Sequence, residues 1–179
     1  MKILGINGSA SRNSSNLLIL KFIQETGKDH FDLIIYEDLS RLPHFRTELT
    51  DQNVPEPVTE FRTLIEKSEG VIISTPEYIF SIPSGLKNAL EWCVSATVFT
   101  GKPVAIITAS AGGEKGHEEL KLILKTVMAE INDNTSLLIR GVKGKIGRDG
   151  KIVDPETDAR LKDFVKSVIR RFGISGRKT

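Results

Sequence analysis

Short, uninterrupted runs of apolar residues recur at five places along the chain. Between them lie longer segments in which apolar residues repeat with helical spacing. The runs are rich in β-branched residues and occupy Lys2–Ile6, Phe31–Tyr36, Gly70–Ser74, Val104–Thr108 and Ser136–Arg140. Such runs are typical of strands covered on both faces, as in a parallel sheet, whereas half-exposed strands alternate apolar with polar residues. We therefore expect five buried parallel strands.

Amphipathic helices are predicted between and after these strands. Their expected ranges are Ser14–Gly27, Pro57–Lys67, Pro83–Ala96, His117–Ile131 and Glu156–Phe172. Strict alternation of strand and helix indicates an α/β protein with a doubly wound parallel sheet. Right-handed crossovers favour the strand order 2-1-3-4-5 for five strands. The length of 179 residues suits one domain spanning 1–179, in which we expect 171–179 to form a flexible tail.

Two longer connections interrupt the alternation. The segment Glu37–Glu56 contains two prolines and many polar residues, so we expect an ordered surface excursion. The segment Gly141–Asp154 contains the pair Asp149-Gly150 between short apolar pairs. This pattern favours a small hairpin.

Composition and charge exclude several classes of protein. The hydrophobic fraction of 39% and charged fraction of 27% are ordinary for a globular protein. A net charge of +2 does not argue for nucleic acid or a membrane surface, and the basic residues at the C-terminus suit a solvated tail better than a nucleic-acid arm. No stretch approaches the roughly 20 apolar residues of a membrane span. The apolar N-terminal run is too short for a signal peptide, so a cytoplasmic protein is expected.

Cysteine and histidine usage narrows the possible chemistry. A single cysteine, Cys93, excludes an intrachain disulfide, a CxxC redox pair and a protein-held iron–sulfur cluster. It follows Trp92 in a helical run, and we expect a small core residue rather than a redox thiol. The scattered His30, His44 and His117 lack metal-ligand spacing, so no metal site is expected.

The strand order predicts where a ligand binds. In an open parallel sheet, ligands lie beyond the carboxyl ends of the strands, at the point where the strand order reverses. For the order 2-1-3-4-5 this point falls at the loops after the first, third and fourth strands. These are also the three most unusual stretches of the sequence.

The first of these loops is rich in hydrogen-bond donors and enters a helix directly. Its backbone N–H groups and the helix dipole converge on one place, which suits a phosphate monoester. It matches neither the dinucleotide motif GxGxxG nor the P-loop motif. Taken alone, it is equally consistent with a helix cap and a turn that bind nothing. The candidate ligand-binding residues are Ser9, Ser11, Arg12, Ser14, Ser15 and Asn16.

The second and third loops suit a flat ring. The second is apolar and aromatic for a helix entrance, and such a wall can cover the edge of a ring system. Its candidates are Pro76, Glu77, Tyr78, Ile79 and Phe80, although core or interface packing of the two aromatic residues is an alternative. The third loop contributes Ser110, Gly112 and Gly113, whose adjacent glycines allow close backbone approach to a ligand. A plain turn between strand and helix is the alternative there.

These loops together resemble the NADPH-dependent FMN reductase family of flavodoxin-like proteins, which includes quinone, azo-dye and chromate reductases. The resemblance covers nearly the whole chain. The family's first loop has the form G-S-x-R-x-x-S-x-N, which the chain follows at Gly8-Ser9, Ser14 and Asn16. Ser11 stands where the family has arginine, and Arg12 follows one step later.

The second family motif is the most specific. It has the form P-E-Y-N-x-S-x-P-G-x-L-K-N-A, followed by a hydrophobic residue, an acidic residue and tryptophan. The chain follows it from Pro76 to Trp92. Ile79 replaces the asparagine, and the glycine is displaced by one position to Gly85. Ser110 and the two glycines after it resemble the third flavin loop of the family.

The resemblance implies an enzyme that uses FMN, with the first loop at its phosphate and the later loops along its ring. NADPH or NADH would supply electrons for a small acceptor (a flavin, quinone, azo compound or metal oxyanion) in a ping-pong reaction. No catalytic side chain is expected, because the flavin carries the chemistry. The resemblance also implies a homodimer or homotetramer with the flavin at the subunit interface. Ser84–Ala96 and Glu37–Glu56 would help to form that interface, with Phe45, Phe80 and Trp92 exposed.

A flavodoxin-type electron carrier, reduced by a partner protein, is the alternative function. Such carriers tend to be acidic, and the net charge of +2 argues mildly against one. A response-regulator domain needs an acidic cluster after the first strand and an aspartate ending the third. The chain has Asn7-Gly8 and Thr75-Pro76 at those places, and it lacks the GxSxG motif of an esterase.

Overall fold

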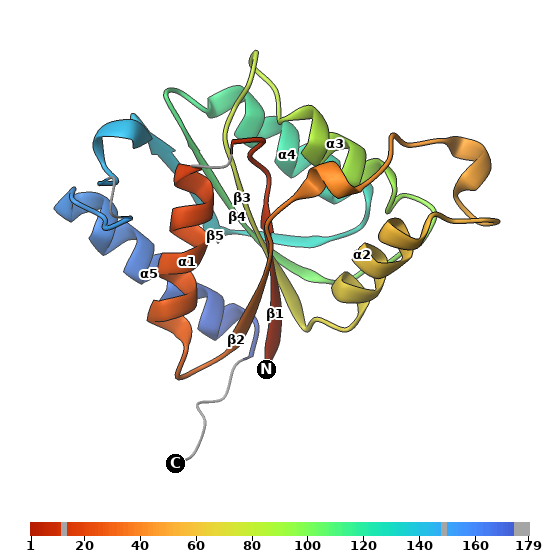
Figure 1. Cartoon of the computed structure of the whole chain (residues 1–179). Helices are drawn as coiled ribbons and strands as arrows, with labels where there is room; N and C mark the ends of the chain where they lie inside the picture. The colour runs from red at the N-terminus through yellow and green to blue at the C-terminus, as the bar shows by residue number, and fades with distance from the viewer. Residues whose placement is uncertain (12–13, 148–149, 174–179) are drawn as a thin grey trace.

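A five-stranded parallel sheet forms the centre of the protein (Figure 1). The computed structural model describes residues 1–11, 14–147 and 150–173. The strand order is β2-β1-β3-β4-β5, and every neighbouring pair is parallel, which confirms the predicted doubly wound, flavodoxin-like sheet. The strands are β1 (Lys2–Asn7), β2 (Asp32–Tyr36), β3 (Gly70–Thr75), β4 (Pro103–Ser110) and β5 (Glu130–Arg140).

Helices cover both faces of the sheet. One face carries α1 and α5, and the other carries α2, α3 and α4 (Figure 1). Neighbouring residues of β1 point to opposite cores, Ile3 into the first and Leu4 into the second, because side chains alternate along a strand. The helices are α1 (Ser15–Gly27), α2 (Glu56–Glu66), α3 (Ser84–Glu91), α4 (Glu114–Thr126) and α5 (Pro155–Arg171), with the short 3-10 helices η1 (Leu39–Arg41), η2 (Thr47–Leu49) and η3 (Val142–Gly144).

Several predicted boundaries are wrong: β5 begins at Glu130 instead of Ser136, and α4 begins at Glu114 instead of His117. The helix expected to reach Ile131 ends at Thr126, because Met128 adopts a left-handed conformation and β5 already begins at Glu130. The helix expected to reach residue 96 ends at Glu91. Of the tail expected over 171–179, Arg171 ends α5 and Phe172 is buried in the core beside α5. The rest of that tail, 174–179, lies outside the described residues.

The excursion between β2 and α2 is ordered by side chains of the α3 segment. The Trp92 indole N–H donates to the carbonyl oxygen of Pro43 (2.8 Å), and the Asn88 amide donates to the same oxygen (3.0 Å). The Asn88 side-chain oxygen accepts from the backbone N–H of Phe45 (2.8 Å). Trp92 is fully buried, which contradicts its expected exposure, and Phe45 is half-buried against it. Of the three aromatic residues expected to be exposed, Phe80 is the one with a large exposed surface.

The second long connection begins with η3, which precedes the expected hairpin. An antiparallel bridge between Ile146 and Ile152 follows, so the predicted pairing is present beyond η3. Arg148 and Asp149, at the expected turn, lie outside the described residues. No helix in the described ranges combines the length and hydropathy needed to cross a bilayer.

Candidate functional site

Two cavities lie at the carboxyl end of the sheet, on either side of the loop that follows β1. The first, here called the serine-lined cavity, measures about 370 Å³, and the second, the acidic cavity, about 520 Å³. Both fall in the range of small-molecule sites. The serine-lined cavity is formed by Ser9, Ser11, Ser14, Ser15, Asn16, Pro76, Tyr78, Ala109, Ser110, Ala111, Gly141, Val142 and Lys143. The acidic cavity includes Glu37 and Asp38, and it shares Ser9 and Ser11 with the first.

The start of α1 forms one wall of the serine-lined cavity. Ser14 caps the helix, and its hydroxyl accepts from the backbone N–H groups of Asn16 (3.1 Å) and Leu17 (3.4 Å). The first turn of α1 contains no acidic side chain. The positive end of the helix dipole is therefore not compensated by a carboxylate there, and it favours an anion in the cavity.

Asn16 fixes this helix start against the sheet. Its side-chain amide is buried, donates to the carbonyl oxygen of Ala109 (3.1 Å) and accepts from the Ser74 hydroxyl (2.9 Å). Asn16 thus connects α1 to the ends of β3 and β4. Both Ser14 and Asn16, which match the family motif, use their side chains for internal bonds. They determine the shape of the loop, while Ser9, Ser11 and Ser15 have more exposed side chains.

The turn after β1 requires glycine. The backbone N–H of Gly8 donates to the carbonyl oxygen of Ser74 (2.8 Å), and a Cβ on Gly8 would lie 2.7 Å from the Thr75 hydroxyl oxygen. The Ser9 hydroxyl accepts from the backbone N–H of Ser11 (3.2 Å) and lies 3.4 Å from the Tyr78 hydroxyl. The first and second loops therefore meet across the cavity.

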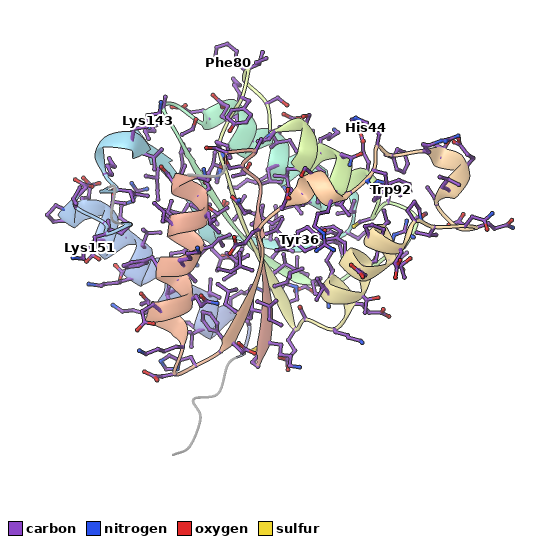
Figure 2. The ribbon with its side chains drawn as sticks, viewed as in Figure 1. Tyr36, His44, Phe80, Trp92, Lys143 and Lys151 are labelled. Atoms are coloured by element: carbon purple, nitrogen blue, oxygen red, sulfur yellow. The ribbon has the colours of Figure 1, made fainter. Side chains whose placement is uncertain are left out.

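The second loop narrows into a two-residue turn. The backbones of Tyr78 and Ser81 exchange two hydrogen bonds (2.9 and 3.0 Å) around Ile79 and Phe80. Both central residues have positive φ angles, +52° and +57°, as a type I′ turn demands. Their side chains are 95% and 77% exposed, and Figure 2 shows Phe80 at the tip of the molecule. Neither residue lines a cavity described above.

Glu77 joins the second loop to the third. Its carboxylate accepts from the backbone N–H of Gly116 in the first turns of α4 (2.8 Å), and its carbonyl oxygen accepts from the Ser110 hydroxyl (3.4 Å). Gly113 begins α4 with a φ of +111°, a conformation suited to glycine. Glu77, Gly112 and Gly113 do not line the serine-lined cavity. Glu77 instead connects the second loop to the third loop and to the start of α4.

The loop after β5 is the part of the site that the sequence pattern did not predict. The backbone N–H of Gly141 donates to the carbonyl oxygen of Ala111 (3.1 Å), which joins this loop to the one after β4. Val142 is buried in the core on the α1 and α5 face, and Lys143 next to it lines the cavity. Only its position could have indicated this role, because β5 lies beside β4 and the loop follows β5 at the carboxyl end of the sheet.

The structure thus brings together eight of the predicted site residues. These are Ser9, Ser11, Ser14, Ser15, Asn16, Pro76, Tyr78 and Ser110. It places Glu77, Ile79, Phe80, Gly112 and Gly113 outside the cavity lining, while Arg12 lies outside the described residues.

The remaining titratable candidates have structural surroundings. Both ring nitrogens of His117 bond to hydroxyls, Nδ1 to Thr108 (2.8 Å) and Nε2 to Ser136 (3.0 Å), and burial, with a smaller effect of Lys121, lowers its pKa. Burial raises the pKa of the Cys93 thiol to about 12, so this thiol is unreactive. Among the described residues, no group of three or more His, Cys, Asp or Glu side chains is placed to hold a metal ion.

The donors of the serine-lined cavity fit the phosphate end of FMN. Hydroxyls, backbone N–H groups at a helix start and one lysine are present among the described lining residues, and none of these residues carries a carboxylate. Pro76, Tyr78 and the segment Ala109–Ala111 add an apolar and aromatic border where the ring would lie. The acidic cavity differs in its lining, which contains the carboxylates of Glu37 and Asp38.

Comparison with known proteins agrees with this arrangement. The sequence pattern of NADPH-dependent FMN reductase matches residues 1–140. The chain is 33% identical to the NADH:(hydroxy)cinnamate reductase subunit CrdA of Vibrio ruber, covering 94% of this chain and 86% of that protein. It is 32% identical to the NADH-dependent flavin reductase subunit 2 of Lactobacillus johnsonii, covering 94% and 97%.

A solved structure is similar over almost the full length. The flavoenzyme NAD(P)H:(acceptor) oxidoreductase FerB from Paracoccus denitrificans superposes with a TM-score of 0.85 at 26% identity, covering 96% of this chain and 97% of that one. The family match spans most of the sequence, and the relatives cover nearly all of it. The chain therefore belongs to the NADPH-dependent FMN reductase family.

Proposed function

We propose that this FMN-dependent NAD(P)H oxidoreductase acts as a single domain that passes electrons to a small oxidised acceptor by a ping-pong sequence. The acceptor would be a flavin, quinone, azo compound or metal oxyanion. The observation that carries the proposal is the serine-lined cavity, where three loops predicted from the sequence converge. Its described lining contains hydroxyls and a lysine and no carboxylate. The names of similar proteins, among them an NADH-dependent flavin reductase and a quinone reductase of Escherichia coli, support the acceptor class.

The redox chemistry, a hydride taken from NAD(P)H and two electrons returned to the acceptor, is that of the bound FMN. Ser9, Ser11 and Ser15 would donate hydrogen bonds to the phosphate, and the start of α1 adds its dipole. Arg12, one position after the arginine of the family motif, would add charge. Ser14 and Asn16 would act as positioning residues, because their side chains hold the loop rather than the ligand.

The later loops would frame the ring. Pro76 and Tyr78 border the cavity on one side and Ser110 on the other. Glu77, through its bond to Gly116, would keep these two borders at a fixed separation. We assign Ile79, Phe80 and the backbone of Gly112-Gly113 to the outer edge of the ring, beyond the cavity itself.

We also propose a homodimer or homotetramer in which the α3 segment and the excursion after β2 bring a second copy near the flavin. Phe80 and Val94 support this arrangement, because they are large apolar side chains with 77% and 64% of their surface exposed. Light scattering coupled to size-exclusion chromatography, with and without FMN, measures the oligomeric state. A monomer under both conditions contradicts this part of the proposal.

The decisive experiment is a visible spectrum of the purified protein with FMN, before and after anaerobic addition of NADPH, with NADH in parallel. Loss of the absorbance of protein-bound flavin with either nucleotide, at a catalytically useful rate, supports the oxidoreductase. Bound FMN that neither nucleotide reduces favours the electron carrier instead. Absence of FMN binding refutes both. Initial rates at several acceptor concentrations then test the ping-pong sequence, which predicts parallel double-reciprocal plots.

A further inference from the structure

Lys143 is the one charged side chain among the described residues that line the serine-lined cavity. No described residue pairs with Lys143, and its side chain is exposed at the upper rim of the molecule (Figure 2). On the other side of the first loop, the acidic cavity carries Glu37 and Asp38. Among the described residues that line the two cavities, Lys143 is therefore the one cation.

The lysine is held in place by the backbone that carries it. Gly141 adopts a φ of +63°, which turns the chain out of β5 and into η3. Its N–H bond to Ala111 ties the turn to the loop after β4, and the neighbouring Val142 is anchored in the core. The backbone just before Lys143 is thus held by one hydrogen bond and one buried side chain, while the Lys143 side chain itself is exposed.

Neighbouring cations do not take this role. Arg140 bonds to Glu114 at the start of α4 (2.5 Å), and Lys145 lies 3.7 Å from Asp154. Neither residue lines the serine-lined cavity. Of the three basic residues at 140, 143 and 145, Lys143 is the one that combines an unpaired charge with a place at the cavity.

We propose that Lys143 binds the phosphate of FMN and supplies charge that the family motif assigns to an arginine at the position of Ser11. This inference rests on the proposed function, since it assumes FMN in the serine-lined cavity. The phosphate, rather than the ring, is the expected partner, because Lys143 shares the cavity with the hydroxyls of the first loop and the start of α1. A lysine acts on a phosphate as a point charge without needing a planar pairing geometry.

The test compares FMN with riboflavin, which has the same ring and lacks the phosphate. Dissociation constants are measured by flavin fluorescence titration for the full chain and for Lys143→Gln, Lys143→Arg and the control Lys28→Gln. Lys28 follows α1 at the opposite end of the helix and pairs with Glu25, so its variant removes one positive charge away from the site. Thermal melts establish that each variant is folded.

We expect Lys143→Gln to weaken FMN binding by about tenfold, the effect of losing one partly exposed charge-assisted bond. Riboflavin binding should stay unchanged, Lys143→Arg should retain most of the FMN affinity, and Lys28→Gln should match the parent chain. Raising the ionic strength should weaken FMN binding less in Lys143→Gln than in the parent, because screening acts on the charge that the variant lacks.

Three results overturn the inference while leaving the proposed function intact. They are FMN affinity unchanged by Lys143→Gln, an equal loss for FMN and riboflavin, and an effect confined to the KM for NADPH. The last would place Lys143 at the nucleotide rather than at FMN. A parent chain that binds no FMN is a different outcome, which refutes the proposed function and this inference together.

Discussion

Replacing Ile79 and Phe80 by Asn and Gly should stabilise the folded chain by about 2 kcal/mol, because the native pair is strained. Both residues have positive φ angles, and the side chains are 95% and 77% exposed, so they contribute little packing in return. Asn-Gly is the sequence that a type I′ turn prefers. The hydrogen bonds between Tyr78 and Ser81 would close the turn equally well in the variant.

The magnitude follows from the two backbone conformations. A left-handed conformation costs most L-residues roughly 1–2 kcal/mol, whereas Asn and Gly adopt it routinely. At position 80, glycine gives back about 0.4–1 kcal/mol of the gain through the larger entropy of the unfolded chain. The net gain is about 1 kcal/mol at each position. For a chain of this size, about 2 kcal/mol corresponds to a rise in Tm of roughly 4–8 °C.

The assay is urea unfolding at 25 °C, followed by circular dichroism and repeated at several protein concentrations. Association adds a concentration-dependent contribution to the apparent stability, and the strain contribution is the part that stays constant. Leu122→Gln on α4 is the matched control, because it removes a 66% exposed apolar side chain from a helix and relieves no strain. This control should change the free energy of unfolding by less than about 0.5 kcal/mol.

An unchanged or lowered free energy of unfolding in the double variant would refute the reasoning, because strain would then not dominate at this turn. An equal rise in the Leu122 control would refute it as well, since removal of an exposed apolar side chain would explain the gain. A confirmed gain would show that this turn stores strain in the native chain.

Three further predictions concern stability. Burial lowers the pKa of His117, so the unfolded state binds its proton more tightly. The free energy of unfolding should be level above about pH 7 and should fall as the pH drops through the unfolded pKa of 6.5, by at most about 1.4 kcal/mol per pH unit. Urea titrations at about pH 5–8 measure this slope, and the variant His117→Gln should lack it. Gly70→Ala should destabilise the folded chain by about 1–3 kcal/mol, because the added Cβ would clash with the Phe172 ring. Adding Phe172→Leu to this variant should restore part of the lost stability, as measured by thermal melts. Asn88→Ala removes two hydrogen bonds to the excursion after β2 and should cost about 2 kcal/mol, with faster proteolysis of that segment and an unchanged rate elsewhere.

The sheet and its order were predictable from sequence because buried parallel strands leave a strong local signal. Uninterrupted apolar runs identified β1 and β3, whose residues from Ile3 to Ile6 and throughout Gly70–Thr75 are buried. The start of β5 was missed because this local signal is lacking there. Its first half, from Glu130 to Asn134, is mostly exposed and polar, so no apolar run marks it. The left-handed conformation at Met128 that separates it from α4 has no signal in a methionine.

Site residues were predictable where a local sequence motif determines the backbone conformation. They were not predictable where contacts between distant segments determine it. Gly8 and Asn16 could be recognised because a turn and a buried bridge tolerate few residue types at those positions. The place of Trp92 could not, because its burial depends on the carbonyl of Pro43, contributed by a distant excursion. Lys143 is the clearest case, since nothing in its neighbours suggests a ligand. It reaches the cavity because β5 lies beside β4 and the Gly141–Ala111 bond turns the next residues toward the first loop. A charge that the first-loop motif leaves out at Ser11 can therefore be supplied by a loop more than a hundred residues later, which sequence spacing alone does not reveal.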